Sequence, residues 1–194
     1  MIKAIVFDCF GVLYVHASEP YFTKHPKHSL ALQELRRQAD MGVYDRNQYI
    51  NEVAHVTGDS PELIMKIHQQ EYMPNQALID YIRKELHDHY KIGMLTNVGK
   101  GWIQDFFDEH QLHDLFNAVA VSSEIGAIKP DPAAYQAILS MLAVNPDEAV
   151  MVDDISENCA GAQRYGMRAV HYQAYHQAIA ELNSILASNQ FPGK

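Results

Sequence analysis

Polar residues stand at the ends of several short apolar stretches in this chain. They are Asp8 after AIVF, Thr96 and Asn97 after IGML, Lys129 in the loop that follows a third stretch, and Asp153 and Asp154 after AVMV. A carboxylate can act as a covalent nucleophile, and Mg²⁺ prefers carboxylate oxygens as ligands. Taken singly, each residue is more often a turn residue, a helix cap or a surface charge. Taken together, they supply a nucleophile, a hydroxyl donor, a cation and a carboxylate pair for a metal.

For these residues to act together, the apolar stretches must form neighbouring strands. Apolar runs at 3–7, 91–96, 118–122, 149–153 and 167–172 alternate with helical patterns at 102–110, 132–142, 157–165 and 173–187. Such alternation is typical of βαβ units, and strands that are apolar throughout are covered on both faces. We therefore expect an α/β fold with a doubly wound parallel sheet. In such sheets ligands bind at the carboxyl ends of the strands, where the polar residues stand.

The segment 15–86 separates the first expected strand from the second and is far longer than one crossover helix needs. It shows helical periodicity at 29–41, 45–57 and 61–70, and no convincing strand. We therefore expect a discontinuous α/β core domain, residues 1–14 and 87–194, with a small helical cap, residues 15–86, above the carboxyl end of the first strand. The alternative is a surface excursion that is unrelated to function.

Composition narrows the class of partner and the compartment. The chain has 194 residues, with 24 acidic against 15 basic residues and a formal net charge of -9, so it would repel a nucleic acid. No stretch approaches the roughly 20 apolar residues of a membrane span, and the N-terminus lacks the pattern of a signal peptide. The two cysteines, Cys9 and Cys159, form no disulfide framework. We expect a cytoplasmic protein that binds neither nucleic acid nor membrane.

Four motifs carry a resemblance to a known family. They are AIVFDCFGVLY, GMLTN, GAIKPDPAAY, and VMVDDISEN followed by GAQRYGM. In order, spacing and context the chain resembles the haloacid dehalogenase-like (HAD) superfamily, most of whose members are phosphatases. The match covers residues 1–14 and about 88–175, whereas the cap matches only in position and helical character. The resemblance implies a hydrolase that acts on a small phosphorylated metabolite.

The resemblance also implies a role for each motif residue in phosphoryl transfer. Asp8 would attack phosphorus and form an aspartyl-phosphate. Thr96 would donate a hydrogen bond to a phosphoryl oxygen, helped by Asn97, which would contact the substrate. Lys129 would neutralise charge on Asp8 and on the transferring group, and such electrostatic stabilisation is usually the largest contribution to catalysis.

A Mg²⁺ cofactor follows from the same resemblance. Asp154 would bind the ion beside Asp8, with Asp153 either binding it or holding a metal-bound water, and Phe10 would offer its backbone carbonyl. Asn158 would orient the residues around the ion. Carboxylates that meet without a cation repel one another, which independently favours a bound metal.

Phe10 is where the sequence departs from the family pattern. Phosphatases of the family carry here an aspartate that acts as general acid, a contribution worth roughly 10²–10⁴-fold in rate, and phenylalanine cannot donate a proton. Three interpretations remain open. The chain is a phosphatase whose leaving group departs without much help, such as that of an acyl phosphate or a sugar 1-phosphate; a metal-independent dehalogenase, whose relatives carry an aromatic Tyr here; or a binding protein that has lost turnover.

Several other residues have simpler explanations than a place in the site. Cys9 follows Asp8 on the strand, so alternation turns its thiol away from the crevice. His25 and His28 lack a third ligand at suitable spacing, and we expect them on a solvated face of the cap. Trp102 follows the second motif and is expected to pack its helix. Four cap cations either meet an anionic substrate or serve as surface charge: Lys24, Lys27, Arg36 and Arg37.

Overall fold

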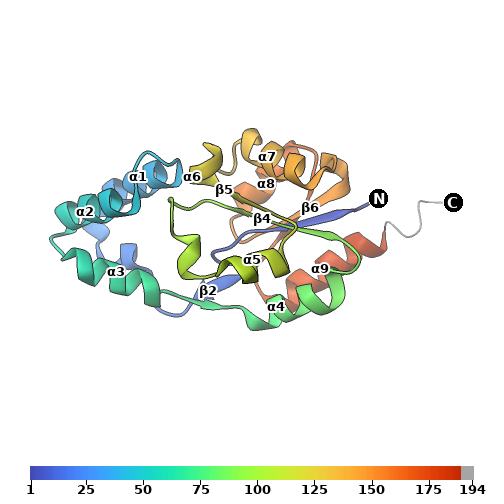
Figure 1. Ribbon diagram of the computed structural model, residues 1–194, viewed down its shortest axis with the longest axis horizontal. Helices are drawn as coiled ribbons and strands as arrows, with labels where there is room; N and C mark the ends of the chain where they lie inside the picture. The colour runs from blue at the N-terminus through green and yellow to red at the C-terminus, as the bar shows by residue number, and fades with distance from the viewer. Residues whose placement is uncertain (189–194) are drawn as a thin grey trace.

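A five-stranded parallel sheet forms the centre of the molecule (Figure 1). The structure is a computed structural model, and it describes residues 1–188. The strands lie in the order β5-β4-β1-β6-β7, with the bounds β1 Ala4–Phe7, β4 Lys91–Thr96, β5 Ala118–Val121, β6 Ala149–Asp153 and β7 Arg168–His171. This sheet confirms the predicted α/β fold class. Because β1 lies between β4 and β6, with Phe7 in register with Met94 and Val152, the polar residues after these strands come together.

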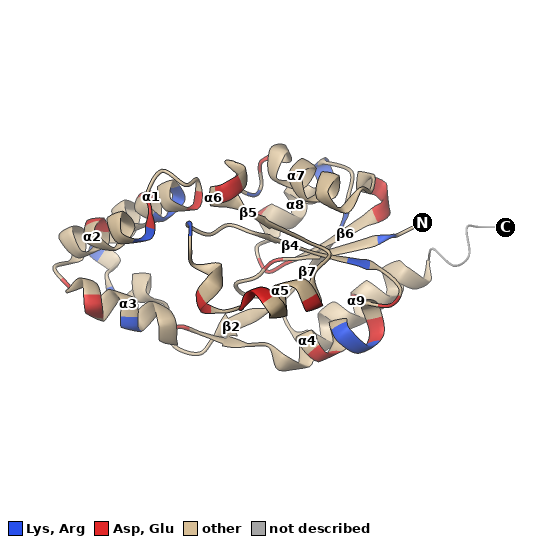
Figure 2. Cartoon of the chain, in the orientation of Figure 1, with Lys and Arg blue, Asp and Glu red and all other residues tan. Residues whose placement is uncertain are grey.

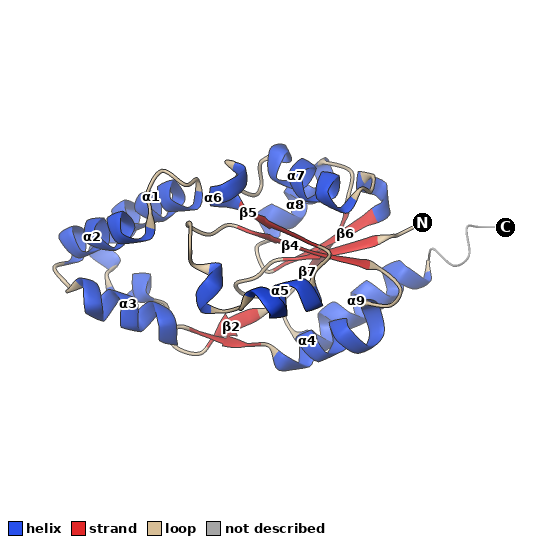
Figure 3. Cartoon of the chain, in the orientation of Figure 1, coloured by secondary structure: helices blue, strands red, loops and turns tan. Residues whose placement is uncertain are grey.

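Helices cover both faces of the sheet (Figure 3). Alternate residues of a strand point to opposite faces: Ile5 and Phe7 pack in the cluster that contains helices α4, α5 and α9, whereas Ala4 and Val6 pack with α7 and α8. The bounds of the helices are α4 Gln76–Tyr81, α5 Glu109–Leu115, α6 Ser122–Ile125, α7 Pro132–Leu142, α8 Ser156–Arg164 and α9 Tyr175–Ala187. Among the residues described, no helix is both long enough and apolar enough to cross a membrane.

Three further helices lie beyond the carboxyl end of the sheet (Figure 1), and we call them the cap helices: α1 Ser29–Asp40, α2 Arg46–Thr57 and α3 Pro61–Gln70. Asp45 caps the N-terminus of α2, because its side chain accepts a hydrogen bond from the backbone N–H of Gln48. Gly58 caps the C-terminus in the left-handed conformation. The apolar side chains of the cap helices form a second cluster with Trp102 of the core, and this cluster includes Leu32, Ile50, Val53 and Ile64.

Two short antiparallel strands connect the core with the cap helices. Strands β2 (Tyr14–His16) and β3 (Tyr72–Pro74) form a separate two-stranded sheet. The expectation that 15–86 holds no strand is therefore wrong at residues 15–16 and 72–74, because strands of three residues are too short to show a period of two. Helix α4 also packs in the main core through Leu78 and Ile79. The division into a core domain and a cap remains a prediction.

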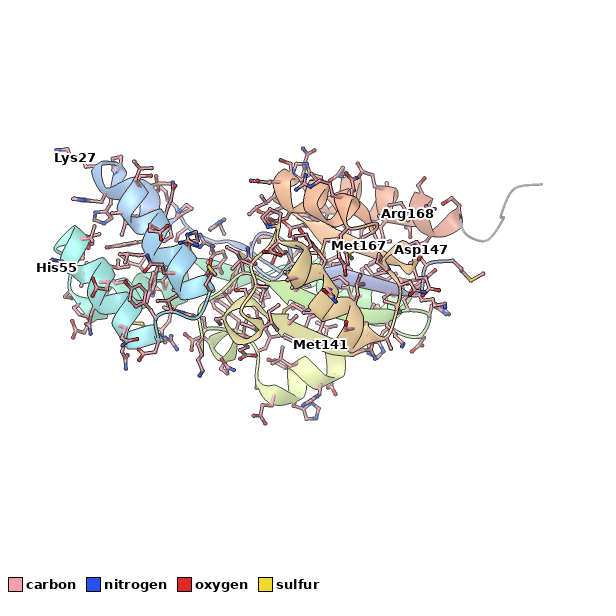
Figure 4. The ribbon with its side chains drawn as sticks, turned by 90° about the horizontal axis from the view of Figure 1, so that it is seen from above. Lys27, His55, Met141, Asp147, Met167 and Arg168 are labelled. Atoms are coloured by element: carbon pink, nitrogen blue, oxygen red, sulfur yellow. The ribbon has the colours of Figure 1, made fainter. Side chains whose placement is uncertain are left out.

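Charged residues are spread over the molecule. In the view of Figure 2, Lys and Arg lie among Asp and Glu on the cap helices and on the helices around the sheet. Figure 4 shows Lys27 at the end of the cap helices farthest from the sheet, and Asp147 at the opposite end of the molecule. Lys27 therefore lies far from the strand ends that carry the candidate site.

Candidate active site at the carboxyl edge of the sheet

Lys129 joins two aspartates at the carboxyl edge of the sheet. Its Nζ atom lies 2.9 Å from Asp8 Oδ2 and 2.7 Å from Asp153 Oδ2. Asp8 follows β1 and Asp153 ends the neighbouring strand β6, so adjacent parallel strands deliver the two carboxylates, and the loop after α6 delivers the lysine. All three residues are buried. The structure thus brings together three of the residues that the sequence singled out.

Asn97 holds the backbone of Lys129. Its Nδ2 donates to the carbonyl of Lys129 at 2.9 Å, and its Oδ1 accepts from the backbone N–H of Lys129 at 2.8 Å. Both polar atoms of the amide are therefore occupied within the protein. The contact between Asn97 and the substrate that the sequence suggested stays a prediction, and in the structure this side chain positions the backbone of Lys129.

Asp153 and Asp154 differ in their surroundings although they are neighbours in the chain. Asp153 Oδ1 accepts from the backbone N–H of Ile155 at 2.9 Å, and the amide of Asn158 lies 3.1 and 3.2 Å from its two oxygens, beside the Lys129 contact. Asp154 Oδ1 is buried and has no hydrogen-bond partner among the described residues. Carboxylate oxygens of Asp8, Asp153 and Asp154 all lie within 4.8 Å of one another. Asp154 therefore offers the oxygen that is most available to a cation.

Gly11 makes room for the Asp154 carboxylate. A Cβ atom at Gly11 would lie 2.3 Å from Asp154 Cγ, and the glycine has a φ of +90, a conformation that side chains rarely adopt. The backbone carbonyl of Asp154, in turn, lies 2.9 Å from His171 Nε2. The sequence reasoning missed both residues. Gly11 stands within the first motif, directly after Phe10, and this place was a usable signal for it, whereas nothing in the sequence pointed to His171.

Three carboxylates share one ammonium in this site. Burial raises the pKa of Asp8 to about 7, and Asp153 and Asp154 add to that rise while Lys129 opposes it. Burial also raises the pKa of Asp154, with a further contribution from Asp153. Burial lowers the pKa of Lys129, but the two aspartates that it contacts more than offset this, so that its pKa is raised overall. A bound cation would relieve the excess of negative charge.

Thr96 and Phe10 border the aspartates. Thr96 ends β4, is fully buried, and its Oγ1 has no hydrogen-bond partner in the described part of the chain. Phe10 is partly buried between the rings of Tyr72 and Phe106, at centroid distances of 4.7 and 5.0 Å. Thr96 thus keeps a hydroxyl free for a ligand, whereas Phe10 contributes an apolar ring.

A pocket lies between the core and the cap helices, and we call it the cap–core pocket. The core lines it with Phe10, Asn97 and Trp102 among others, and the cap helices and their connections line it with Arg36 and Glu71 among others. Trp102 both packs and lines the pocket, since it is buried and contacts Tyr49 and Arg46. Of the four cap cations, only Arg36 lines this pocket; Arg37 pairs with Glu34.

The remaining candidates lie outside the site. Cys9 is fully buried and contacts the site only through its backbone N–H, which donates to Asp8 Oδ1 at 2.7 Å, and Cys159 is also a buried free thiol. His25 pairs with Asp59 at 3.1 Å. Within residues 1–188, the three aspartates are the only group of three or more histidines, cysteines or acidic residues with metal-binding geometry.

Comparisons with known proteins identify chains of similar sequence and similar fold. Over 80 residues the chain is 50% identical to a protein named Phosphatase MT3486 from Mycobacterium tuberculosis, a stretch that covers 41% of this chain and 37% of that protein. A HAD-family enzyme from Bacteroides thetaiotaomicron, crystallised with magnesium and inorganic phosphate, has the same fold with a TM-score of 0.74 and 20% identity, covering 90% of this chain and 96% of that one. L-2-haloacid dehalogenase from Xanthobacter autotrophicus matches with a TM-score of 0.65 and 19% identity, covering 99% and 85%.

The match to the M. tuberculosis phosphatase spans well under half of that protein, and the two structural matches establish the fold. A model of the haloacid dehalogenase-like hydrolases matches residues 13–172, which is most of this chain. The chain therefore belongs to the haloacid dehalogenase-like hydrolase family.

Proposed function

We propose that this protein is a magnesium-dependent phosphatase that acts on a small phosphorylated metabolite through an aspartyl-phosphate on Asp8. The observation that carries the proposal is the contact of Lys129 with Asp8 and Asp153, beside an Asp154 oxygen without a partner in the described chain. The phosphatase from M. tuberculosis and the Bacteroides enzyme that binds magnesium and phosphate support the same activity.

The reaction takes place in two steps at Asp8. A carboxylate oxygen of Asp8 attacks phosphorus while the bond from phosphorus to the leaving oxygen breaks, and the electron pair of that bond departs with the leaving oxygen. Water then attacks the same phosphorus and releases a proton to solvent, and the phosphorus–Asp8 bond breaks with its electron pair returning to the carboxylate. Lys129 favours the ionised form of Asp8, and the free hydroxyl of Thr96 donates to a phosphoryl oxygen.

The aspartates fit a magnesium ion. Asp8 and Asp154 would hold it with the backbone carbonyl of Phe10, and Asp153 would support it while engaged with Lys129 and Asn158. Mg²⁺ accepts a few carboxylates and completes its coordination with waters and phosphate oxygens, which suits this sparse set. When bound, the ion would neutralise charge on the phosphoryl group and on the aspartates.

Phe10 limits the substrates. Its ring packs against Tyr72 and Phe106 and offers no proton to a departing oxygen. The favoured substrates are those whose leaving group is stable as an anion, such as acyl phosphates and sugar 1-phosphates. Leaving groups that need a proton, such as simple alkoxides, would depart slowly.

The cap helices would close the site from water. Arg46 of α2 contacts Asp105 and the ring of Trp102 in the core, and Ser122 of the core donates to the carbonyl of Asp40 at the end of α1. These contacts join cap and core beside the cap–core pocket.

The compartment is a separate part of the proposal. We place the protein in the cytoplasm, since its two thiols are free and buried.

A metal-independent dehalogenase is the second candidate, favoured by the aromatic ring of Phe10. Halide leaves without a proton, so such an enzyme needs no general acid. The buried Asp154 oxygen without a described partner weighs against this alternative. A buried carboxylate oxygen needs a partner, and a metal-free site would supply no cation to pair with it.

A substrate screen tests the proposal. Phosphorylated metabolites and 2-haloacids are incubated with the protein with and without Mg²⁺, and phosphate and halide release are measured. We expect phosphate release that requires Mg²⁺ and is lost in Asp8→Asn, with Asp147→Asn at the far end of the core as the matched control (Figure 4). Halide release without metal, or phosphate release that survives Asp8→Asn, would contradict the proposal.

A further inference from the structure

The cap–core pocket contains buried polar atoms without partners among the described residues. Glu71 lines the pocket and is only 2% exposed, and its Oε2 makes no hydrogen bond. His68 lines the same pocket, and its buried Nε2 is likewise without a partner in the described chain. Buried polar groups in proteins are nearly always hydrogen-bonded. A ligand in this pocket would supply the missing partners.

The surroundings of Glu71 leave it as an acceptor. Two imidazoles lie near it, with His16 Nδ1 3.5 Å from Oε1 and His68 Nδ1 3.6 Å from Oε2, which is too long for good hydrogen bonds. Burial lowers the pKa of His68 to about 4, so this ring is uncharged near neutral pH and does not neutralise the carboxylate. The backbone of Tyr21 and the side chain of Tyr72 also form hydrogen bonds with Glu71, and Arg36 is a positive charge near it. Oε2 still has no hydrogen-bond partner in the described chain, so this oxygen can accept a donor from a ligand.

The pocket walls are aromatic. Besides His68, six of the residues that line it carry aromatic rings: Phe10, Phe22, Tyr49, Tyr72, Trp102 and Phe106. Phe10, Tyr72 and Phe106 contact one another on one side, and Tyr49 and Trp102 contact each other with a centroid distance of 6.2 Å. Rings pack favourably against rings in offset or edge-to-face geometry. A planar ligand suits these walls.

Arg36 is the cation that lines the pocket, and Asp40 and the ring of Phe22 compensate its charge. Its guanidinium lies 5.7 Å from the centre of the Phe22 ring, and its Nε lies 3.8 Å from Asp40 Oδ2. The pocket therefore does not require a second anionic group on the ligand.

We propose that the cap–core pocket binds the leaving group of an aryl phosphate whose ring carries a hydroxyl or amino group, and that this group donates a hydrogen bond to Glu71. The inference rests on the proposed phosphatase function and names its substrate class. It agrees with an independent feature of the site: a phenolate departs without the proton that Phe10 cannot supply. The aromatic walls and the Glu71 Oε2 atom without a described partner thus point to one kind of leaving group.

Trp102 provides a direct readout of this pocket, because it lines the pocket and is the single tryptophan of the chain. Its fluorescence is followed in the presence of Mg²⁺ while the protein is titrated with phosphonates that cannot be hydrolysed: benzylphosphonate, its three ring-hydroxylated isomers, and cyclohexylmethylphosphonate. We expect the best hydroxylated isomer to bind roughly tenfold more tightly than benzylphosphonate, as a hydrogen bond to a charged acceptor provides. Cyclohexylmethylphosphonate should bind more weakly than benzylphosphonate.

Glu71→Leu should abolish the preference for the hydroxyl group, whereas Glu62→Gln on the exposed surface of α3 should preserve it. The inference is overturned if no hydroxylated isomer binds more tightly, if the preference survives Glu71→Leu, or if the cyclohexyl compound matches the benzyl compound. The wild-type comparisons decide the question even where the variant does not fold. Hydrolysis of 4-nitrophenyl phosphate, which carries no donor, reports on the proposed phosphatase function separately.

Discussion

Asn97 and Lys129 are joined by two hydrogen bonds that use both polar atoms of the asparagine amide, at 2.9 and 2.8 Å. The pair links the loop after β4 to the loop after α6. It thereby fixes the backbone from which the Lys129 ammonium reaches Asp8 and Asp153. The position of the Lys129 ammonium therefore depends on the Asn97 side chain.

Asn97→Ala should lower kcat and leave KM nearly unchanged. The substitution frees the backbone of Lys129, and a small misplacement of a catalytic group can cost as much as roughly a hundredfold in rate. Steady-state kinetics on an aryl phosphate would measure both constants, with Asn183→Ala, which removes an exposed contact to Tyr81, as the control. A rise in KM with an unchanged kcat would show instead that Asn97 binds the substrate.

Gly11→Ala should weaken Mg²⁺ binding. The added Cβ would lie 2.3 Å from Asp154 Cγ and would displace the carboxylate, and disturbing the support of a metal ligand typically costs roughly 10–100-fold in affinity. Calorimetric titration with Mg²⁺ measures this loss.

Gly58→Ala is the matched control for Gly11→Ala. Gly58 has a φ of +80, close to the +90 of Gly11, but a Cβ there would meet nothing within 4 Å. Both substitutions should lower Tm through backbone strain, roughly 1 kcal/mol of unfolding free energy, and only Gly11→Ala should reduce Mg²⁺ affinity. An equal affinity in the two variants would show that Asp154 does not need this space.

The sequence was sufficient to predict the sheet and the residues at its edge. β1, β4 and β6 are runs of buried apolar residues, and a polar residue at the end of such a run faces the crevice of an open α/β sheet. The proximity of Asp8 and Asp153 follows from the strand order, in which β1 lies beside β6, and the apolar runs alone do not specify that order.

The partners of these residues could not be predicted. Apart from the family resemblance, nothing in the sequence distinguishes Asp153 from Asp154. In the structure, oxygens of Asp153 contact Lys129 and Asn158, whereas Asp154 Oδ1 has no partner in the described chain. Arg36 and Glu71 come to one pocket only because the cap helices fold over the core. Such contacts arise from tertiary packing, which no local pattern encodes.

Phe10→Asp should restore activity on alkyl phosphates. In the wild type, the rate should fall steeply as the pKa of the leaving alcohol rises, because no acid protonates the departing oxygen. A carboxyl group at this position can supply at most roughly 10²–10⁴-fold, and loss of packing against Tyr72 and Phe106 will reduce the gain. The gain should be smallest for 4-nitrophenyl phosphate. Equal wild-type rates on alkyl and aryl phosphates would mean that another residue donates the proton.

Arg46→Ala should loosen the cap over the pocket. Arg46 contacts Asp105 and lies 4.3 Å from the centre of the Trp102 ring, so its removal deletes an ion pair and a cation–π contact between α2 and the core. We expect a higher KM and greater quenching of the Trp102 fluorescence by acrylamide. Arg37→Ala, which breaks a surface pair with Glu34 within α1, should change neither. Unaltered quenching in Arg46→Ala would show that this contact does not hold the cap closed.

The most direct test of the account is to trap the covalent intermediate. The protein is mixed with an aryl phosphate and Mg²⁺, quenched in acid within one turnover, digested, and examined by mass spectrometry. We expect a phosphoryl group on Asp8 that forms only with Mg²⁺ and is absent from Asp8→Asn. Phosphate release without any adduct on Asp8, or an adduct on the neighbouring Cys9, would contradict it.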